Sequence, residues 1–244
     1  RVIDGKGATL MPGLIDSHTH LSWANAKPIA EFAQLIAEGK ASFKDWPYYG
    51  QQASLTEAEN RLMSGYTAVR EVGGVGHLVK GCVDTTLNDK GVATIGRPGP
   101  RILYAGAVIS PTGGHADAET DLEESFHIIK NLDQMSVQQR ENLIMQADAF
   151  GMRKADGVSE VKRAVRDQFV KGAQFIKLAT GGGSSSPHDP IDATTYSADE
   201  VRAATEVTDG LNTYATTHAY ESYTVERDLS QGVQMVEHGN IITD

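Results

Sequence analysis

Cysteine is nearly absent from the chain, since Cys82 is the only one among 244 residues. A single cysteine excludes an internal disulfide, so a packed core or bound metal must stabilise the fold. Long apolar runs are lacking too. No window approaches the roughly 18 consecutive apolar residues that a membrane span requires, and Pro111 and several glycines interrupt the uncharged stretch 102–116. The sequence therefore predicts no membrane partner.

Positive charge is scarce as well. Lys and Arg total 22 against 32 Asp and Glu, which gives a net charge of −10. This balance provides no basic footprint for a phosphate backbone and disfavours a nucleic-acid partner. The 40% hydrophobic share together with 25 glycines is ordinary for a globular chain. About 250 residues is also the usual size of a (β/α)8 barrel.

Several catalytic motifs are missing. Gly73, Gly74 and Gly76 do not complete a G-x-G-x-x-G dinucleotide motif, because Val79 occupies its last position. The chain contains no G-x-S-x-G and no H-E-x-x-H. A serine hydrolase of the nucleophile-elbow type is therefore disfavoured, and so is a metalloprotease of the H-E-x-x-H type.

Apolar runs that end in polar or glycine residues alternate with helical patterns. Such runs are typical of strands that enter loops at one end of a sheet. The predicted strands are 10–20, 66–74, 101–110, 173–180, 212–220 and 233–239. The predicted helices are 28–38, 55–63, 159–170, a helix opened by the capping-box pattern of Ser197 and Glu200, and 219–229. The alternation predicts an α/β fold with parallel strands.

Two histidines, His18 and His20, end the first predicted strand. Side chains at positions i and i+2 of a strand point to the same side, so both imidazoles face one point and could bind a divalent metal. The alternative is a strand-end pair without a ligand. Lys177 lies in the apolar run Phe-Ile-Lys-Leu-Ala-Thr, where a buried ammonium is costly unless it is paired or neutral. The alternative is a lysine whose head reaches water.

His218 and His238 end the fifth and sixth predicted strands. Either one alone is more typical of a structural or surface residue. Together with His18, His20 and Lys177, they place four imidazoles and an amine at the same end of parallel strands. That end carries the functional site in β/α folds, so the coincidence indicates one site.

The order of these groups resembles the amidohydrolase superfamily, with His-x-His on strand one, Lys on strand four, His on strand five and His on strand six. The local sequence motifs are also similar. They are M-P-G-L-I-D-S-H-T-H-L, G-Y-T-A-V-R-E-V-G-G, I-S-P-T-G-G-H, F-I-K-L-A-T-G-G-G-S-S-S-P-H-D, T-H-A-Y and V-E-H-G-N. The chain resembles in particular the branch of imidazolonepropionase-like proteins, Xaa-Pro dipeptidases and ochratoxinase-type amidases. The resemblance covers nearly the whole chain.

The resemblance implies a (β/α)8 TIM barrel of the amidohydrolase type over residues 10–244, here truncated after strand six. Residues 1–9 would be a remnant of an N-terminal β-sandwich, and residues 111–157 a lid-like insertion. Because the chain opens at Arg1 without a Met, we expect a trimmed N-terminus, which is compatible with export. The compartment stays unknown.

The resemblance also assigns a ligand set. His18 and His20 would bind one of two divalent metals, His218 and His238 would bind the other, and a CO₂-derived carbamate on Lys177 would bridge them. Zn²⁺ suits this imidazole-rich set best. A metal-bridging hydroxide would attack an amide carbonyl. The general-base Asp that the family places at the end of strand eight is not in this chain, since Asp244 is expected to cap a following helix.

These roles imply a binuclear metal-dependent hydrolase of amide or peptide C–N bonds. Its substrates would be small and carboxylate-bearing, such as dipeptides, N-acyl amino acids or ochratoxin-like amides. One alternative is a cyclic-amide hydrolase of the imidazolonepropionase type, or a deaminase. Another is an inactive metal-binding fragment. We expect the protein to form a homo-oligomer. We expect its binding partner to be a small-molecule substrate.

Candidate substrate-binding residues follow the strand ends. His115 and Tyr220 could donate to a carbonyl oxygen or a carboxylate, or could only pack loops. The loop after the fourth strand adds Gly182, Ser184 and His188. Its glycines permit backbone N–H groups to converge on an anion, and the alternative is a flexible linker.

Overall fold

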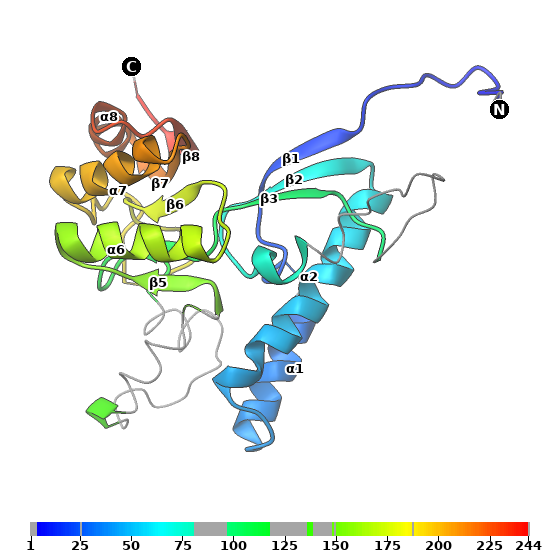
Figure 1. The fold of residues 1–244 in the computed structure, drawn as a ribbon, viewed down its shortest axis with the longest axis horizontal. Helices are drawn as coiled ribbons and strands as arrows, with labels where there is room; N and C mark the ends of the chain where they lie inside the picture. The colour runs from blue at the N-terminus through cyan, green and yellow to red at the C-terminus, as the bar shows by residue number, and fades with distance from the viewer. Residues whose placement is uncertain are drawn as a thin grey trace.

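The computed structural model describes residues 4–24, 26–80, 97–117, 136–138, 148, 150–186 and 188–243. These ranges contain both strands and helices, which alternate from β5 onward, and every pair of named strands is parallel. The elements build the α/β arrangement drawn in Figure 1, which confirms the predicted class. None of the described helices is long and apolar enough to cross a membrane.

The strands form two parallel sheets. The first has the order β1-β2-β3, from Leu14–Thr19, Tyr66–Glu71 and Arg101–Tyr104. The second has the order β5-β4-β6-β7-β8, from Met152–Lys154, Val108–Ser110, Ile176–Ala179, Ala215–Glu221 and Met235–Ile241. The chain runs directly from β3 into β4, so residues 101–110 join the two sheets.

One predicted strand, 101–110, is two strands in the structure. Gly106 adopts a left-handed φ of 77° between them, and a Cβ on Gly106 would lie 2.4 Å from Gln168 Oε1. That oxygen accepts a hydrogen bond from the backbone N of Ala107 at 2.9 Å. The kink gives each half its own partners, because β3 pairs with β2 whereas β4 pairs with β5 and β6.

The predicted lid-like insertion 111–157 ends within the sheet. Its residues Met152–Lys154 form β5, which pairs in parallel with β4. A strand of three residues shows no alternation that a sequence pattern could reveal. Residues 118–135, 139–147 and 149 of this segment lie outside the described residues.

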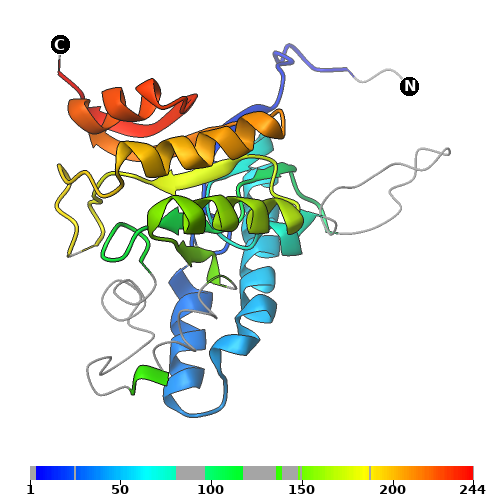
Figure 2. The same cartoon turned by 60° about the vertical axis from the view of Figure 1, so that its left-hand side comes forward.

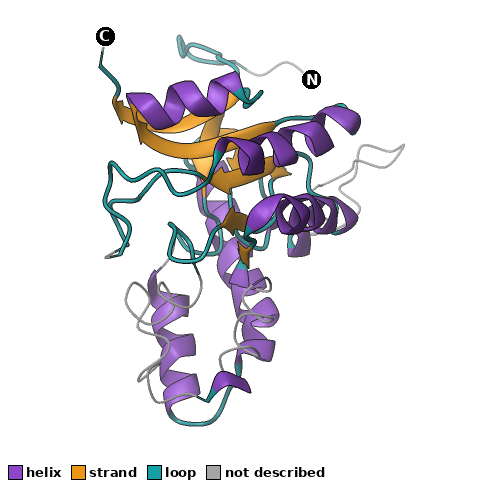
Figure 3. Ribbon diagram, turned by 90° about the vertical axis from the view of Figure 1, so that its left-hand side faces the viewer, coloured by secondary structure: helices purple, strands orange, loops and turns teal. Residues whose placement is uncertain are grey.

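Helices α1 (Ala26–Ala37) and α2 (Trp46–Met63) form a hairpin through a short 3₁₀ helix, Phe43–Asp45 (Figure 3). Trp46 is fully buried, and its ring packs 5.1 Å from Phe32 and 4.2 Å from Phe150. Helix α2 therefore begins well before the predicted start at residue 55. Pro47 is accepted there, because the first turn of a helix has no backbone acceptor for its N–H.

Helices α6 (Gly157–Val170), α7 (Ala198–Gly210) and α8 (Ser222–Ser230) cover the outer face of the second sheet (Figure 2). The apolar faces of α6 and α7 pack on strand residues such as Ile176 and Leu178. Ser197 and Glu200 form the predicted capping box of α7. Helix α8 starts later than predicted, because residues 219–221 continue β7.

The predicted sandwich remnant, 1–9, is described from residue 4 onward. Residues 4–13 form an exposed arm that leads into β1 (Figure 1). This arm contains a turn at Lys6 and Gly7 and no strand among its described residues.

Candidate functional site

Five histidine rings lie in a row at the carboxyl ends of the strands. The row runs from His20 to His18 at 5.3 Å, on to His238 at 4.8 Å, to His218 at 4.3 Å and to His115 at 4.1 Å between ring centroids. These residues come from both sheets and from widely separated segments of the chain. The structure thus brings together the four predicted histidine ligands and one predicted substrate contact.

Lys177 lies on β6 and is 2% exposed. Its Nζ has no hydrogen-bond partner among the described residues. Burial lowers the pKa of Lys177 to about 7; the charge of Glu237 opposes this shift and that of Arg70 adds to it. The alternative in which its head reaches water is therefore wrong, and a large neutral fraction of the amine exists near pH 7.

The histidines around Lys177 are held neutral. Burial lowers the pKa of His20 to about 3 and that of His238 to about 4, and it lowers the pKa of His218 further still. The charge of Lys177 lowers the pKa of all three, so the amine faces the same region as the rings. Neutral imidazoles offer the lone pairs that a metal ion needs.

Hydrogen bonds orient the rings. His20 Nδ1 lies 2.9 Å from the carbonyl oxygen of Gly73, and His218 Nε2 lies 3.2 Å from that of Gly182. A carbonyl only accepts, so each of these nitrogens carries the proton and the opposite nitrogen carries the lone pair. The lone pair of His218 Nδ1 faces His238 Nε2 at 3.0 Å.

The donor set can be compared with what a metal ion requires. As the rings stand, no group of three or more described His, Cys, Asp and Glu side chains has a metal-binding arrangement. The chemistry nevertheless fits, because oriented neutral imidazoles share a region with an amine that is buried and has no hydrogen-bond partner within the described ranges. Imidazole nitrogens, with an oxygen donor formed on Lys177, are ligands that Zn²⁺ accepts.

Sequence reasoning missed a carboxylate at this site. Glu237 Oε2 lies 2.7 Å from His18 Nδ1, and Glu237 Oε1 lies 2.9 Å from Arg70 Nη2. Burial favours the neutral acid, but the hydrogen bond from His18 and the charges of Lys177 and Arg70 hold the pKa of Glu237 well below its usual range.

Strand alternation would place Glu237 and His238 on opposite faces of β8. His238 instead adopts a left-handed φ of 78°, and both side chains contact His18. The only sequence signal for Glu237 is a charged residue within the predicted strand 233–239.

The predicted substrate contacts flank the row of rings. Tyr220 stacks on His238 with centroids 4.9 Å apart, and its hydroxyl lies 3.4 Å from Ser184 Oγ. His115 Nδ1 lies 3.0 Å from Ser186 Oγ and 3.5 Å from Asp189 Oδ2. His115, Tyr220 and Ser184 therefore lie beside the rings, and Asp189 is a partner of His115 that sequence reasoning missed.

The glycines of this loop do not form the predicted anion cradle. The backbone N–H groups of Gly181, Gly182 and Gly183 donate to the carbonyl oxygens of His218, Ala193 and Asp189. Gly182 instead contributes its carbonyl oxygen to His218. His188 is exposed on the same loop.

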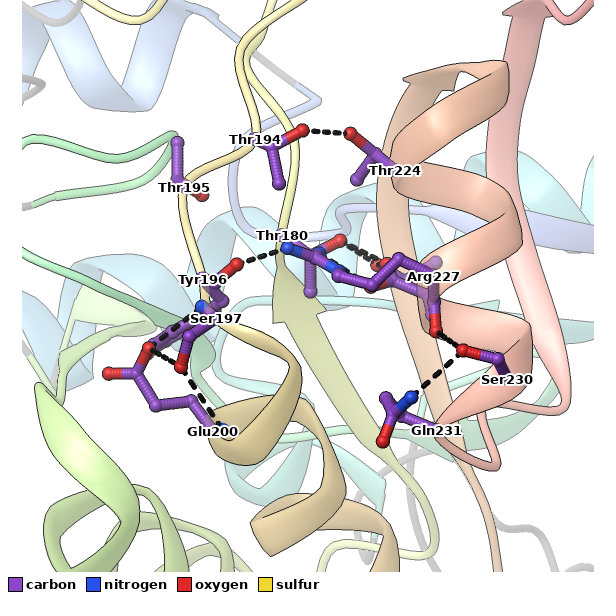
Figure 4. Close-up of polar contacts among 12 residues, drawn as sticks. Thr180, Thr194, Thr195, Tyr196, Ser197, Glu200, Thr224, Arg227, Ser230 and Gln231 are labelled. Atoms are coloured by element: carbon purple, nitrogen blue, oxygen red, sulfur yellow. Dashed lines mark hydrogen bonds and ion pairs between the residues drawn. The ribbon is translucent and has the colours of Figure 1, made fainter.

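The loop that carries these residues, 180–197, is anchored at its base (Figure 4). Thr194 Oγ1 lies 2.6 Å from Thr224 Oγ1 on α8, and Arg227 of the same helix donates to the Tyr196 carbonyl oxygen. The Tyr196 hydroxyl donates to the Ala155 carbonyl oxygen at 2.7 Å. The loop is thus no flexible linker in its second half.

A tryptophan covers the other end of the row. The Trp23 ring stacks on His20 at 4.9 Å between centroids, and its Nε1 donates to the carbonyl oxygen of Phe150 at 3.1 Å. Trp23 therefore supports the orientation of His20.

Comparison with known proteins links this chain to one family. A family model described as Amidohydrolase family matches residues 9–244. Ochratoxinase from Aspergillus niger is 26% identical over 230 residues, which cover 94% of this chain and 43% of that protein. An imidazolonepropionase from Idiomarina loihiensis is 37% identical over 91 residues, which cover 31% of this chain and 22% of that protein.

Solved structures agree with this assignment. The structure of an amidohydrolase superposes with a TM-score of 0.76 and 34% identity, covering 100% of this chain and 52% of that one. A prolidase complexed with N-methylphosphonate-L-proline superposes with a TM-score of 0.68 and 31% identity, covering 96% and 49%. The chain thus spans about half the length of the relatives that it matches.

Proposed function

The chain belongs to the amidohydrolase family, and from this premise we propose that it is a metal-dependent hydrolase of amide or peptide C–N bonds. The observation that carries the proposal is the buried amine of Lys177, which has no hydrogen-bond partner in the part of the chain that the structure describes and lies beside oriented neutral imidazoles. An ordinary structural lysine would be paired or would reach water. In a site that binds cations, a neutral Lys177 avoids the repulsion that a charged ammonium would exert on them.

The proposed roles follow the family resemblance. His18 and His20 would hold one divalent ion, and His218 and His238 a second, with Lys177 as a carbamate between them. When bound, such ions would supply Lewis-acid polarisation of the amide carbonyl and an activated water. Zn²⁺ is the proposed metal because the donors are mainly imidazoles. Lys177 can take up CO₂ only as the free amine, and its lowered pKa supplies that form near pH 7.

The residues beside the rings are proposed to bind the substrate. The ring of His115 ends the row next to His218, and the ring of Tyr220 contacts His218 from the side. Both can donate a hydrogen bond to a carbonyl or carboxylate oxygen. The match to a prolidase complexed with a proline derivative supports a small dipeptide or N-acyl amino acid as the substrate. Ser184 would orient the Tyr220 hydroxyl, whereas His188 stays an untested candidate.

The fold proposal is a TIM barrel to which the chain contributes six strands, if the kinked β3 and β4 count as one and the short β5 is left out. The arc β1-β2-β3/β4-β6-β7-β8 has the parallel neighbours that a barrel requires. The relatives, which are about twice as long, support this reading.

A metal-removal experiment tests the function. We expect treatment with a chelator to abolish hydrolysis of dipeptides and N-acyl amino acids, and added Zn²⁺ to restore it. Lys177→Ala should lose the metal and at least 100-fold of the activity, since removing metal ligation removes the activated water. Lys162→Ala is a matched control, because Lys162 pairs with Glu206 on the helical side. Full activity of Lys177→Ala would contradict the proposal.

A second candidate is hydrolysis of a cyclic amide. The local similarity to an imidazolonepropionase favours it. A panel that sets linear dipeptides and N-acyl amino acids against cyclic amides separates the two. Turnover of the cyclic members alone would replace the first proposal with the second.

A further inference from the structure

A largely buried ionic cluster adjoins the row of rings through His18. We define it as His18, Arg70, Thr216 and Glu237, which come from β1, β2, β7 and β8. Glu237 is its centre. Oε2 lies 2.7 Å from His18 Nδ1, and Oε1 accepts from Arg70 Nη2 at 2.9 Å and from Thr216 Oγ1 at 2.6 Å.

Arg70 is held rigidly on its far side. Its guanidinium carbon lies 4.6 Å from the centroid of the Phe175 ring. Its Nε donates to the Tyr214 hydroxyl at 3.1 Å, and its Nη1 donates to the Ser17 carbonyl oxygen at 2.7 Å. Its side chain is 9% exposed and that of Glu237 is 6% exposed. Arg70 therefore holds the Glu237 carboxylate in position independently of its contact with His18.

This placement determines which nitrogen of His18 carries the proton. A carboxylate only accepts hydrogen bonds, so His18 Nδ1 must be the donor and Nε2 must hold the lone pair. Histidines that bind metal are commonly held in this way by a carboxylate on the other ring nitrogen. His20 reaches the same tautomer through a carbonyl oxygen.

We propose that Glu237, held in place by Arg70 and Thr216, is the positioning residue that fixes the tautomer and orientation of His18 for cation binding. The inference rests on the proposed function, since His18 acts as a ligand only if the protein binds a metal ion. Glu237 itself is not a substitute for a general base, because both of its oxygens are engaged.

The first measurement needs no metal. Nitrogen-15 NMR of the metal-free protein reports the tautomer of each histidine, and loss of one signal in His18→Gln identifies the signal of His18. We expect the Nδ1–H form in the wild type and a shift toward the Nε2–H form in Glu237→Gln, whose amide can donate to Nδ1. An Nε2–H tautomer in the wild type would overturn the inference without any variant of Glu237.

The second measurement is Zn²⁺ affinity, obtained by competition with a chromophoric chelator. We expect Glu237→Gln to bind Zn²⁺ 10- to 100-fold more weakly, which is roughly the loss seen when such a supporting partner is removed. Asp228→Asn is the matched control. Asp228 is a fully buried carboxylate paired with Arg227, and it bonds Thr217 on the opposite face of β7.

The outcomes separate the two proposals. Unchanged Zn²⁺ affinity and tautomer in Glu237→Gln overturn the positioning role while the metal site stands. If the wild type binds no Zn²⁺ but its His18 tautomer depends on Glu237, the metal proposal fails, and of the inference only the control of the tautomer stands. Equal losses in Asp228→Asn and Glu237→Gln would reduce the effect to general stability and overturn the inference.

Discussion

Lys177, His20 and Glu71 show at the scale of single residues how burial sets protonation in this fold. Burial is the largest cause of the shift in all three, lowering the pKa of Lys177 to about 7 and of His20 to about 3 and raising that of Glu71 to about 8. Each shift favours the neutral form. Buried titratable groups such as these are therefore neutral, whereas Arg70 and Glu237 form an ion pair.

Glu71 makes the stability of the protein depend on pH. It is 1% exposed, and its pKa is raised from 4.5 to about 8 although backbone N–H groups donate to it. An acid whose pKa is raised by folding contributes stability that is present below about pH 4.5 and lost as the pH rises toward 8. The loss is on the order of a few kcal/mol.

We therefore expect Glu71→Gln to abolish this part of the pH dependence. Between pH 5 and pH 8.5, the free energy of unfolding of the wild type should fall relative to that of the variant. Urea unfolding at both pH values measures the difference. Parallel behaviour of the two proteins would contradict the assignment of the buried carboxyl.

Gly183 marks a close approach to His115. A Cβ on Gly183 would lie 2.0 Å from His115 Nδ1. We expect Gly183→Ala to displace the His115 ring and to lower kcat/KM by about 100-fold, the scale of a misplacement of about 1 Å at a reacting centre. Gly210→Ala is the control, because nothing lies within 4 Å of its added Cβ. Unchanged kinetics in Gly183→Ala would remove His115 from the substrate site.

At the scale of elements, the sequence predicts which segments are strands better than where each one ends. The runs 66–74 and 173–180 contain β2 and β6, because apolar β-branched runs bounded by glycine are strong signals. The break at Gly106 has no such signal, since a left-handed glycine inside an apolar run looks like any other. The early start of α2 depends on packing of Trp46 against Phe150, which no local pattern encodes.

The capping box of α7 has a measurable contribution. Ser197 Oγ accepts from the Glu200 backbone N, and the Glu200 side chain accepts from the Ser197 backbone N at 2.8 Å. We expect Ser197→Ala to lower the free energy of unfolding by about 1 kcal/mol. Chemical denaturation measures it, with Ser230→Ala at the exposed end of α8 as the comparison. An equal effect at both positions would show that the cap does not contribute specifically.

At the scale of the whole molecule, the site depends on contacts that span most of the chain. His18 and Glu237 are 219 residues apart in sequence, and they join the first strand to the last. Positions on parallel strands sufficed to predict that the four histidines and Lys177 lie in one region, because parallel strands present their carboxyl ends together. Glu237 and Arg70 could not be predicted, since the left-handed His238 overrides strand alternation and the ion pair forms only on folding.

The outer strands predict self-association. In the described part of the chain, β1 pairs only with β2 and β8 only with β7. Apolar side chains lie exposed on both, including Ile15 at 68% and Ile241 at 44%. Such edges favour pairing with further polypeptide, so we expect a mass above 26.2 kDa in light scattering. Ile15→Glu should lower that mass, whereas Val170→Glu on α6 should not. A 26.2 kDa monomer would contradict the expectation.

The row of rings extends across the boundary between the two sheets, which we call the seam. The chain connects the two sheets through the kink at Gly106. His18 and His20 belong to one side of the seam and the remaining rings to the other. A ligand that binds rings on both sides stabilises the packing of the two sheets against each other. The melting temperature should therefore rise as the site is occupied by a ligand. Thermal unfolding curves can thus identify ligands before any turnover is known.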